Sequence, residues 1–226
     1  MRVELFVDPA CWWSWLTSRW LVEVAPKRNL EVRWRAYSLL LRDGPDGLED
    51  WKAVVWGASR RAVRVMQALE SDNPDGVHRF YEAVVTSGVA DYQTGRPPFQ
   101  DLTGALAAAG LPSTYAAAAD DAAWDQPIRQ SMAEASAVVG EGVGTPTLVL
   151  HLDRPVGLLG PLVSAPPTGA EALRLWDAVV AFATVPAVLE LSRPRPPRPK
   201  IPELGIVASG SPQPIARPLT LDGVSQ

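Results

Sequence analysis

The residues best suited to chemistry are a cysteine and a serine that two tryptophans separate, in the run Cys11-Trp12-Trp13-Ser14. Cys11 is the only cysteine of the chain, and it lies between a strand-like segment and a helix-like segment. A helix N-terminus offers unpaired backbone N–H groups and the positive end of the helix dipole, and both favour the nucleophilic thiolate of a cysteine. We therefore predict that Cys11 is a catalytic nucleophile and that Ser14, one turn along, is a second catalytic residue whose hydroxyl donates a hydrogen bond to the sulfur. The competing interpretation is a buried cysteine that only packs.

Aromatic residues surround the cysteine in the sequence. Trp12, Trp13 and Trp15 could form a wall suited to a flat or aromatic ligand, and we predict that Trp12 and Trp13 contact a substrate or thiol. Trp12 is the better ligand candidate, because Trp13 shares its helical spacing with Leu16 and Trp20 and is expected to pack in the core with them.

Several charged residues allow a functional or a plain interpretation. Asp8 could be a buried proton acceptor near the cysteine, or it could simply help to end the first strand. Arg60, Arg61 and Arg64 could reach an acidic ligand group, but a solvated helix face is the favoured interpretation.

The composition excludes several classes of protein. The net charge of −4 argues against nucleic acid as a partner. One cysteine and two histidines cannot supply a structural zinc site, and we expect no metal; His78 and His151 lie in no triad or metal spacing and receive no function. The first residues lack the pattern of a signal peptide, and no run of about 18 apolar residues indicates a membrane span. We therefore expect a cytoplasmic protein with no membrane partner.

The hydrophobic pattern predicts alternating strands and helices. Residues 2–7 alternate as in a strand, a helix follows from Trp12, and residues 30–37 alternate again as a half-exposed strand. A helical region over 48–140 comes next, and its fourth helix is alanine-rich and capped by Ser113. The remaining predicted elements are strands at 147–150 and 156–159 and a helix that starts with a capping box at Thr168 and Glu171 and runs to about Leu191.

This order predicts an α/β protein with a thioredoxin fold. The first two strands should be parallel, because a strand, helix, strand unit makes a right-handed crossover by default. A helical domain is inserted between the second and third strands. We expect residues 1–47 and 141–192 to form the thioredoxin-like domain, residues 48–140 the inserted lobe, and residues 193–226 a proline-rich tail that is extended or disordered.

Short motifs in a shared order point to a known family. Residues 7–25 read VDPACWWSWLTSRWLVEVA, and Trp56-Gly57, residues 109–112, GVGTPT at 142–147, GPLVS at 160–164 and LWD at 175–177 follow. Over residues 2–192 the chain resembles the DsbA-like thioredoxin-fold oxidoreductases, and within them the mycothiol-dependent nitroreductase branch. In that branch the active site is Cys-Pro-Trp-Cys, so Ser14 replaces the second cysteine and Trp12 replaces the proline.

The resemblance implies further site residues and a co-substrate. Thr145-Pro146 corresponds to the cis-proline that lies against the active-site sulfur, and the backbone of Thr145 would pair with a substrate or thiol adduct. The ordinary alternative is a proline at a strand start. Mycothiol would be the small thiol that resolves a mixed disulfide, because one cysteine cannot resolve it internally. No tightly bound cofactor is expected, and no cofactor-binding residues are assigned.

Three functions remain open at this point. The first is a single-cysteine thiol oxidoreductase or reductase whose partners are a small thiol and an electrophilic or disulfide substrate. The second is an enzyme of the kappa glutathione-transferase and hydroxychromene-carboxylate isomerase kind, although that kind usually has serine at the position of Cys11. The third is a binding protein that lost the dithiol and its catalysis. A homodimer is also left open.

Overall fold

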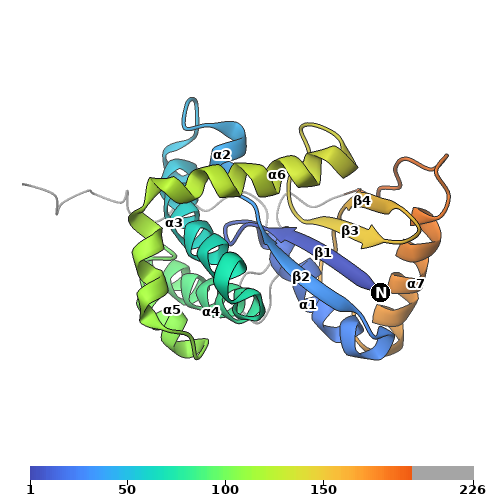
Figure 1. The fold of residues 1–226 in the computed structure, drawn as a ribbon, viewed down its shortest axis with the longest axis horizontal. Coiled ribbons are helices and arrows are strands. Elements are labelled where there is room, and N and C mark those ends of the chain that lie inside the picture. Colours follow the sequence, from blue (N-terminus) through green and yellow to red (C-terminus); the bar gives the residue numbers. More distant parts are fainter. Residues whose placement is uncertain (195–226) are drawn as a thin grey trace, which may run out of the picture.

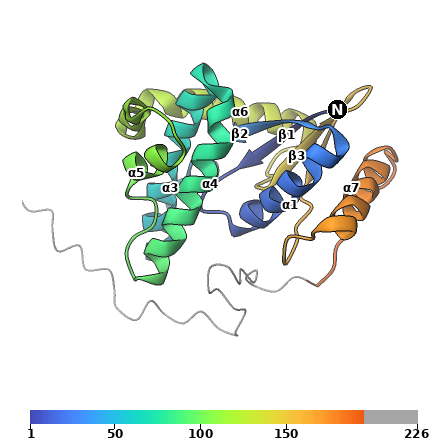
Figure 2. The same ribbon diagram turned by 90° about the horizontal axis from the view of Figure 1, so that it is seen from below.

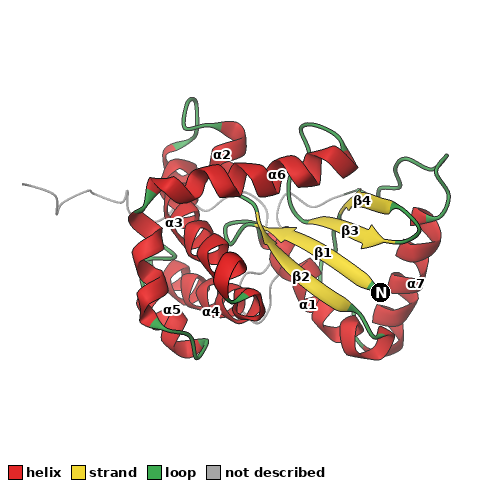
Figure 3. Ribbon diagram, in the orientation of Figure 1, coloured by secondary structure: helices red, strands yellow, loops and turns green. Residues whose placement is uncertain are grey.

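Four strands form one mixed sheet in the order β2-β1-β3-β4. The structure is a computed structural model that describes residues 1–194, so all of the predicted tail at 193–226 except its first two residues lies outside the described residues. β1 and β2 are parallel, whereas β1 with β3 and β3 with β4 are antiparallel. The strands are β1 (Arg2–Val7), β2 (Glu31–Ala36), β3 (Thr147–His151) and β4 (Pro155–Leu159). The predicted strand order and the parallel first pair are therefore confirmed (Figure 3).

The helices surround the sheet and extend it at one end. α1 joins β1 to β2, seven helical segments lie between β2 and β3, and α7 follows β4. Figures 1 and 2 show α1 and α7 on one side of the sheet, α6 on the other, and α3, α4 and α5 beyond the end of the strands. This is the thioredoxin fold with a helical insertion that the sequence predicts. The helices are α1 (Trp12–Arg28), α2 (Leu39–Asp43), α3 (Asp50–Asp72), α4 (Pro74–Gln93), α5 (Leu102–Ala108), the 3₁₀ helices η1 (Ser113–Asp120) and η2 (Ala122–Trp124), α6 (Asp125–Val139) and α7 (Gly169–Ala183).

β1 is a central strand that pairs with β2 and β3, and both of its faces are buried. Leu5 and its neighbours on one face join the large core that contains Leu16 and Trp20 of α1. Phe6, on the other face, packs in a smaller cluster with Val149 of β3 and Ala135 of α6. The sheet is therefore covered by helices on both faces.

Some predicted helix boundaries differ from the structure. The alanine-rich segment after Ser113 is a 3₁₀ helix rather than an α-helix. The predicted capping box is wrong, because the Thr168 side chain makes no capping hydrogen bond. α4 continues through Gly88, where the missing side chain leaves room for the Phe99 ring, since a Cβ atom at this position would clash with the ring. The last helix ends at Ala183.

Candidate active site

Cys11 occupies the N-cap position of α1, with an extended backbone at φ −92° and ψ 101°. Its own N–H donates to the Asp8 carbonyl at 2.9 Å, and its carbonyl accepts the N–H of Trp15 at 3.1 Å. Cys11 thus begins the helix, and its side chain lies at the end where the helix dipole is positive. The residue is 9% exposed, so its sulfur lies just below the surface.

The predicted partner loop lies against this sulfur. The Sγ atom of Cys11 donates a hydrogen bond of 3.3 Å to the carbonyl oxygen of Thr145, and the Thr145-Pro146 bond is cis. The pairing of Phe6 in β1 with Thr147 in β3 brings the two loops together, because the end of β1 then meets the start of β3. Cys11, Thr145 and Pro146 therefore belong to one site.

Ser14 differs from its prediction. Its side chain is fully buried, and among the residues that the structure describes its Oγ atom has no hydrogen-bond partner. The expected hydrogen bond from Ser14 to the Cys11 sulfur is therefore absent, and the thiol pairs with the Thr145 carbonyl instead. A buried hydroxyl without a partner carries a desolvation cost of about 1–3 kcal/mol.

The tryptophans next to Cys11 divide between the two faces of the sheet. Trp12 is half-buried and makes an edge-to-face contact with Tyr92 of α4, at 6.5 Å between ring centroids. Trp13 is also half-buried, but it packs on the small cluster that contains Cys11. The prediction that Trp13 packs with Leu16 and Trp20 is therefore wrong. Trp15 does lie in the large core with Leu16 and Trp20, and its ring centroid is 6.2 Å from that of Tyr81.

Asp8 is a buried carboxylate that sits three residues before the sulfur. It accepts the backbone N–H of Ala10 at 2.8 Å, the backbone N–H of Leu39 at 2.7 Å, and the hydroxyl of Ser59. Burial raises the pKa of the Asp8 carboxyl above its ordinary value, while these three donors act in the opposite direction. Asp8 thus does more than end a strand, because it binds α2 and α3 to the start of α1.

Tyr81 is a fully buried residue near the site that the sequence did not identify. It comes from α4, and its ring packs on Trp15 and Trp34. Burial raises its pKa well above the ordinary value for tyrosine, and the charges of Cys11 and Asp8 act in the same direction. The Tyr81 hydroxyl therefore stays protonated. No local pattern in the sequence connects a residue of the insertion with Cys11.

The three arginines of α3 bind acidic residues of the same lobe. Arg64 is buried and forms a two-pronged ion pair with Asp125, at 2.8 and 2.9 Å. Arg61 pairs in the same way with Asp120, and Arg60 lies 3.9 Å from Asp125. These contacts connect α3 to η1 and α6. The sequence suggested that Arg64 either binds an acidic ligand or lies on a solvated helix face, and both interpretations are wrong because it is buried in an ion pair with Asp125.

The remaining titratable groups build no metal centre in the described chain. Residues 1–194 contain no group of three His, Cys, Asp or Glu side chains that could hold a metal ion. The His78 ring stacks on Trp34 at 4.3 Å, and His151 lies 3.1 Å from Glu4. Over the same residues, no helix has the length and apolar character needed to cross a membrane.

The fold and the site together define a DsbA-like protein of the thioredoxin fold, with Cys11 at the start of α1 and a cis-proline loop beside it. The chain belongs to the Rv2466c-like family, described as mycothiol-dependent nitroreductase Rv2466c, whose family model matches residues 10–193. This is a family of redox enzymes, and both the fold and the family agree with the resemblance seen in the sequence.

The individual proteins that resemble this chain share less than a third of their residues with it. An uncharacterized protein of Mycobacterium tuberculosis, Rv2286c, is 29% identical over 86% of this chain and 83% of its own. The cytosolic disulfide reductase DsbM from Pseudomonas aeruginosa, solved with GSH, has a TM-score of 0.53 and 18% identity, over 80% of this chain and all of its own. A 2-hydroxychromene-2-carboxylate isomerase has a TM-score of 0.51 and 16% identity, and the match covers 82% of this chain and 96% of the isomerase chain. At these identities the two solved structures establish the shared fold.

Proposed function

We propose that this protein is a thiol-dependent oxidoreductase that works through Cys11 alone and uses an external low-molecular-weight thiol such as mycothiol. The observation that carries the proposal is the position of the Cys11 sulfur, at the N-terminus of α1 and 3.3 Å from the carbonyl of Thr145. The family description supports mycothiol as the thiol. A small-thiol co-substrate also supports the cytoplasm as the place of action, because such thiols maintain its reducing state.

The reaction is a pair of thiol–disulfide exchanges. The Cys11 thiolate attacks one sulfur of a disulfide substrate, the S–S bond breaks, and the other sulfur leaves as a thiolate that takes up a proton from water. The small thiol, as its thiolate, then attacks the sulfur that is bonded to Cys11. This step releases the Cys11 thiolate and a disulfide that contains the small thiol. No second cysteine is needed, and Ser14 has no sulfur with which to resolve the adduct.

The surrounding residues supply the binding surface. The Thr145 carbonyl accepts the thiol proton in the free protein. Because a thiolate or a disulfide sulfur has no proton to donate, this carbonyl becomes available to an N–H group of the substrate or adduct as the reaction begins. Pro146 lies beside it, and the half-buried rings of Trp12 and Trp13 provide apolar contact on the side of α1.

Intact-mass measurement tests the proposal directly. The protein is incubated with the disulfide of mycothiol, with glutathione disulfide as a second probe, and we expect one covalent adduct that excess reduced mycothiol removes. Cys11→Ala is the control and should gain no mass. An unmodified wild-type protein, or an adduct that reduced mycothiol cannot remove, would contradict the proposal.

An enzyme of the kappa glutathione-transferase and hydroxychromene-carboxylate isomerase kind is a second candidate. It shares this fold, and the buried Ser14 hydroxyl that lacks a partner in the described chain could serve a thiol that enters as a cofactor. In that case the protein would activate the sulfur of the cofactor, and activity would survive the substitution Cys11→Ser. Under the main proposal the same substitution abolishes turnover. If the protein only binds the thiol, the adduct forms but no substrate is consumed.

A further inference from the structure

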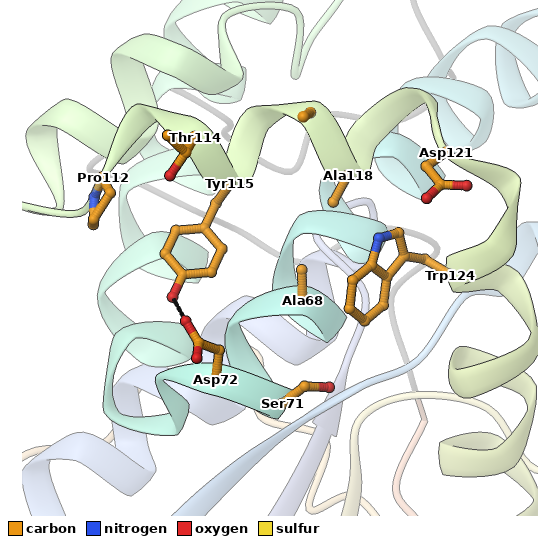
Figure 4. Close-up of a pocket in the computed structure, with 10 residues that line it drawn as sticks. Ala68, Ser71, Asp72, Pro112, Thr114, Tyr115, Ala118, Asp121 and Trp124 are labelled. Atoms are coloured by element: carbon orange, nitrogen blue, oxygen red, sulfur yellow. Dashed lines mark hydrogen bonds between the residues drawn. The ribbon is translucent and has the colours of Figure 1, made fainter.

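A groove in the helical lobe lies apart from the thiol site. It has a volume of about 560 Å³ and runs between α3 and the 3₁₀ helices η1 and η2. Figure 4 shows the rings of Tyr115 and Trp124 on either side of the small side chains of Ala68 and Ala118. The alanines leave the floor open between the two rings. The groove is therefore an aromatic slot built on an alanine-rich segment.

The groove is distinct from the site around Cys11, although α3 contributes to both. Ser59, which binds Asp8 near the sulfur, lies nine residues before Ala68 on α3. At a rise of 1.5 Å per residue, this separation is about 14 Å along the helix axis. A ligand in the groove would therefore not contact the sulfur.

Two carboxylates give the groove a negative charge. Asp72 and Asp121 are exposed, and Figure 4 places them at opposite ends of the slot. Asp72 accepts the hydroxyl of Tyr115, and Asp121 accepts the backbone N–H of Ala123 at 2.9 Å. Each carboxylate keeps further lone pairs for a ligand, because each accepts one hydrogen bond from these partners.

The arginines close to this region already have carboxylate partners. Arg61 pairs with Asp120 and Arg64 with Asp125, so these cations are held outside the slot. Among the described residues that line the groove, none is basic. Aromatic rings beside exposed carboxylates favour a ligand that combines apolar rings with guanidinium groups, since an arginine can lie on an aromatic face and bind a carboxylate with two hydrogen bonds.

The chain itself carries a segment of this chemistry. Residues 195–200 read Arg-Pro-Pro-Arg-Pro-Lys, with three positive charges and no acidic residue. Proline-rich segments bind aromatic grooves as polyproline II helices at a low entropy cost. In a polyproline II helix, two residues three positions apart lie on the same side and about 9 Å from each other, which would hold for Arg195 and Arg198 in the bound segment. The segment therefore offers two arginines, with Pro196 and Pro197 between them, to the two carboxylates of the slot.

We propose that the groove between Tyr115 and Trp124 binds residues 195–200 of this chain. The prolines pack on the two rings, and the arginines bind Asp72 and Asp121. This binding involves no reaction and is independent of the chemistry at Cys11.

Peptide binding to the full chain tests this proposal. The host protein carries Arg195→Ser, Arg198→Ser and Lys200→Ser, so that its own segment cannot compete, and the probe is a fluorescent peptide of residues 193–200. We expect saturable binding, at least five-fold weaker to the wild-type chain, whose own segment occupies the groove. Adding Asp72→Asn and Asp121→Asn to the host should weaken binding at least ten-fold.

Matched controls separate this site from general charge attraction. Asp46→Asn with Asp153→Asn removes the same charge from exposed loops and should leave peptide affinity unchanged. A peptide with alanine for every proline keeps all charges but should bind at least five-fold more weakly. Equal losses from the two aspartate pairs, equal affinity for the two peptides, or no saturable binding would overturn the proposal. Modification of Cys11 should be the same in all these variants, because none lies at the thiol site.

Discussion

The thiol of Cys11 donates its hydrogen bond to the carbonyl oxygen of Thr145, which lies 134 residues further along the chain. The pairing of β1 with β3 creates this contact, because it aligns the end of one strand with the start of the other. The insertion between β2 and β3 does not disturb it. The position of the Cys11 sulfur is therefore set by the sheet, and the following predictions address the groups around it.

Removing the Ser14 hydroxyl should not harm the protein. Its Oγ atom is buried without a partner in the described chain, so Ser14→Ala should leave the free energy of unfolding unchanged or raise it by about 1 kcal/mol. The matched control is Ser18→Ala on the same helix, which removes a 2.6 Å hydrogen bond to the Trp15 carbonyl and should cost about 1 kcal/mol. Urea unfolding compares the two. A larger loss for Ser14→Ala would indicate that its hydroxyl has a partner after all.

Restoring a second cysteine should create an internal resolving thiol. In Ser14→Cys the new sulfur lies one helical turn from Cys11, and we expect the mixed disulfide at Cys11 to convert into an internal disulfide between Cys11 and the introduced cysteine. Intact mass should then show loss of the adduct and of two hydrogens. Ser18→Cys, on the same helix but two turns away, should keep the adduct. Persistence of the adduct in Ser14→Cys would mean that the buried position cannot reach the sulfur.

Asp8 should make stability depend on pH. Its pKa in the folded protein is raised, so between the unfolded and folded values the folded state binds more protons, and stability falls as pH rises through that range. Asp8→Asn removes this pH dependence. It also removes a hydrogen bond, because an amide has one oxygen and cannot accept from the N–H groups of both Ala10 and Leu39 as the two carboxylate oxygens do. We therefore expect Asp8→Asn to cost about 1–3 kcal/mol, with a stability difference from wild type that shrinks as pH rises. A difference that is constant from pH 4 to 8 would argue against a shifted carboxyl.

The buried ion pair in the lobe should matter more than its exposed neighbour. Arg64→Met leaves Asp125 and the Ala119 carbonyl without their donors and should cost about 2–4 kcal/mol, less than a fully buried pair because Asp125 is partly exposed. Arg61→Met removes only the exposed pair with Asp120 and should cost about 0–1 kcal/mol. Thermal or urea unfolding of the two variants provides the comparison. Equal losses would show that burial at Arg64 contributes nothing.

The sequence predicted the sheet well because its pattern is local. Alternation in β1 and β2 gave the strands, and the order of elements gave the fold. Arg35 illustrates where this fails. It alternates with apolar residues in the strand that is predicted to be half-exposed, but it is buried, 2.7 Å from Glu4 and 2.6 Å from Glu70. An arginine that faces water and an arginine that faces buried carboxylates beneath α6 produce the same alternation of polar and apolar residues in the sequence.

The sequence predicts only part of the site, because contacts between distant residues leave no local pattern. Cys11 and Thr145 were paired through a family resemblance, since no local pattern relates them. The misplacement of Trp13 has a physical cause, because α1 is buried on most sides: Ser14, Trp15 and Leu16 are consecutive and all buried. A helix without a polar stripe gives no signal for which face meets which core.

The carboxylate of Asp8 also has a mechanical consequence. Its three donors come from the loop before α1, from the start of α2 and from α3, so a single group joins the sheet to the inserted lobe at the point where they meet. A swing of the lobe away from the sheet would have to break these bonds together and expose a buried acid. The lobe is therefore no freely hinged lid, and sheet and lobe should unfold in one cooperative transition.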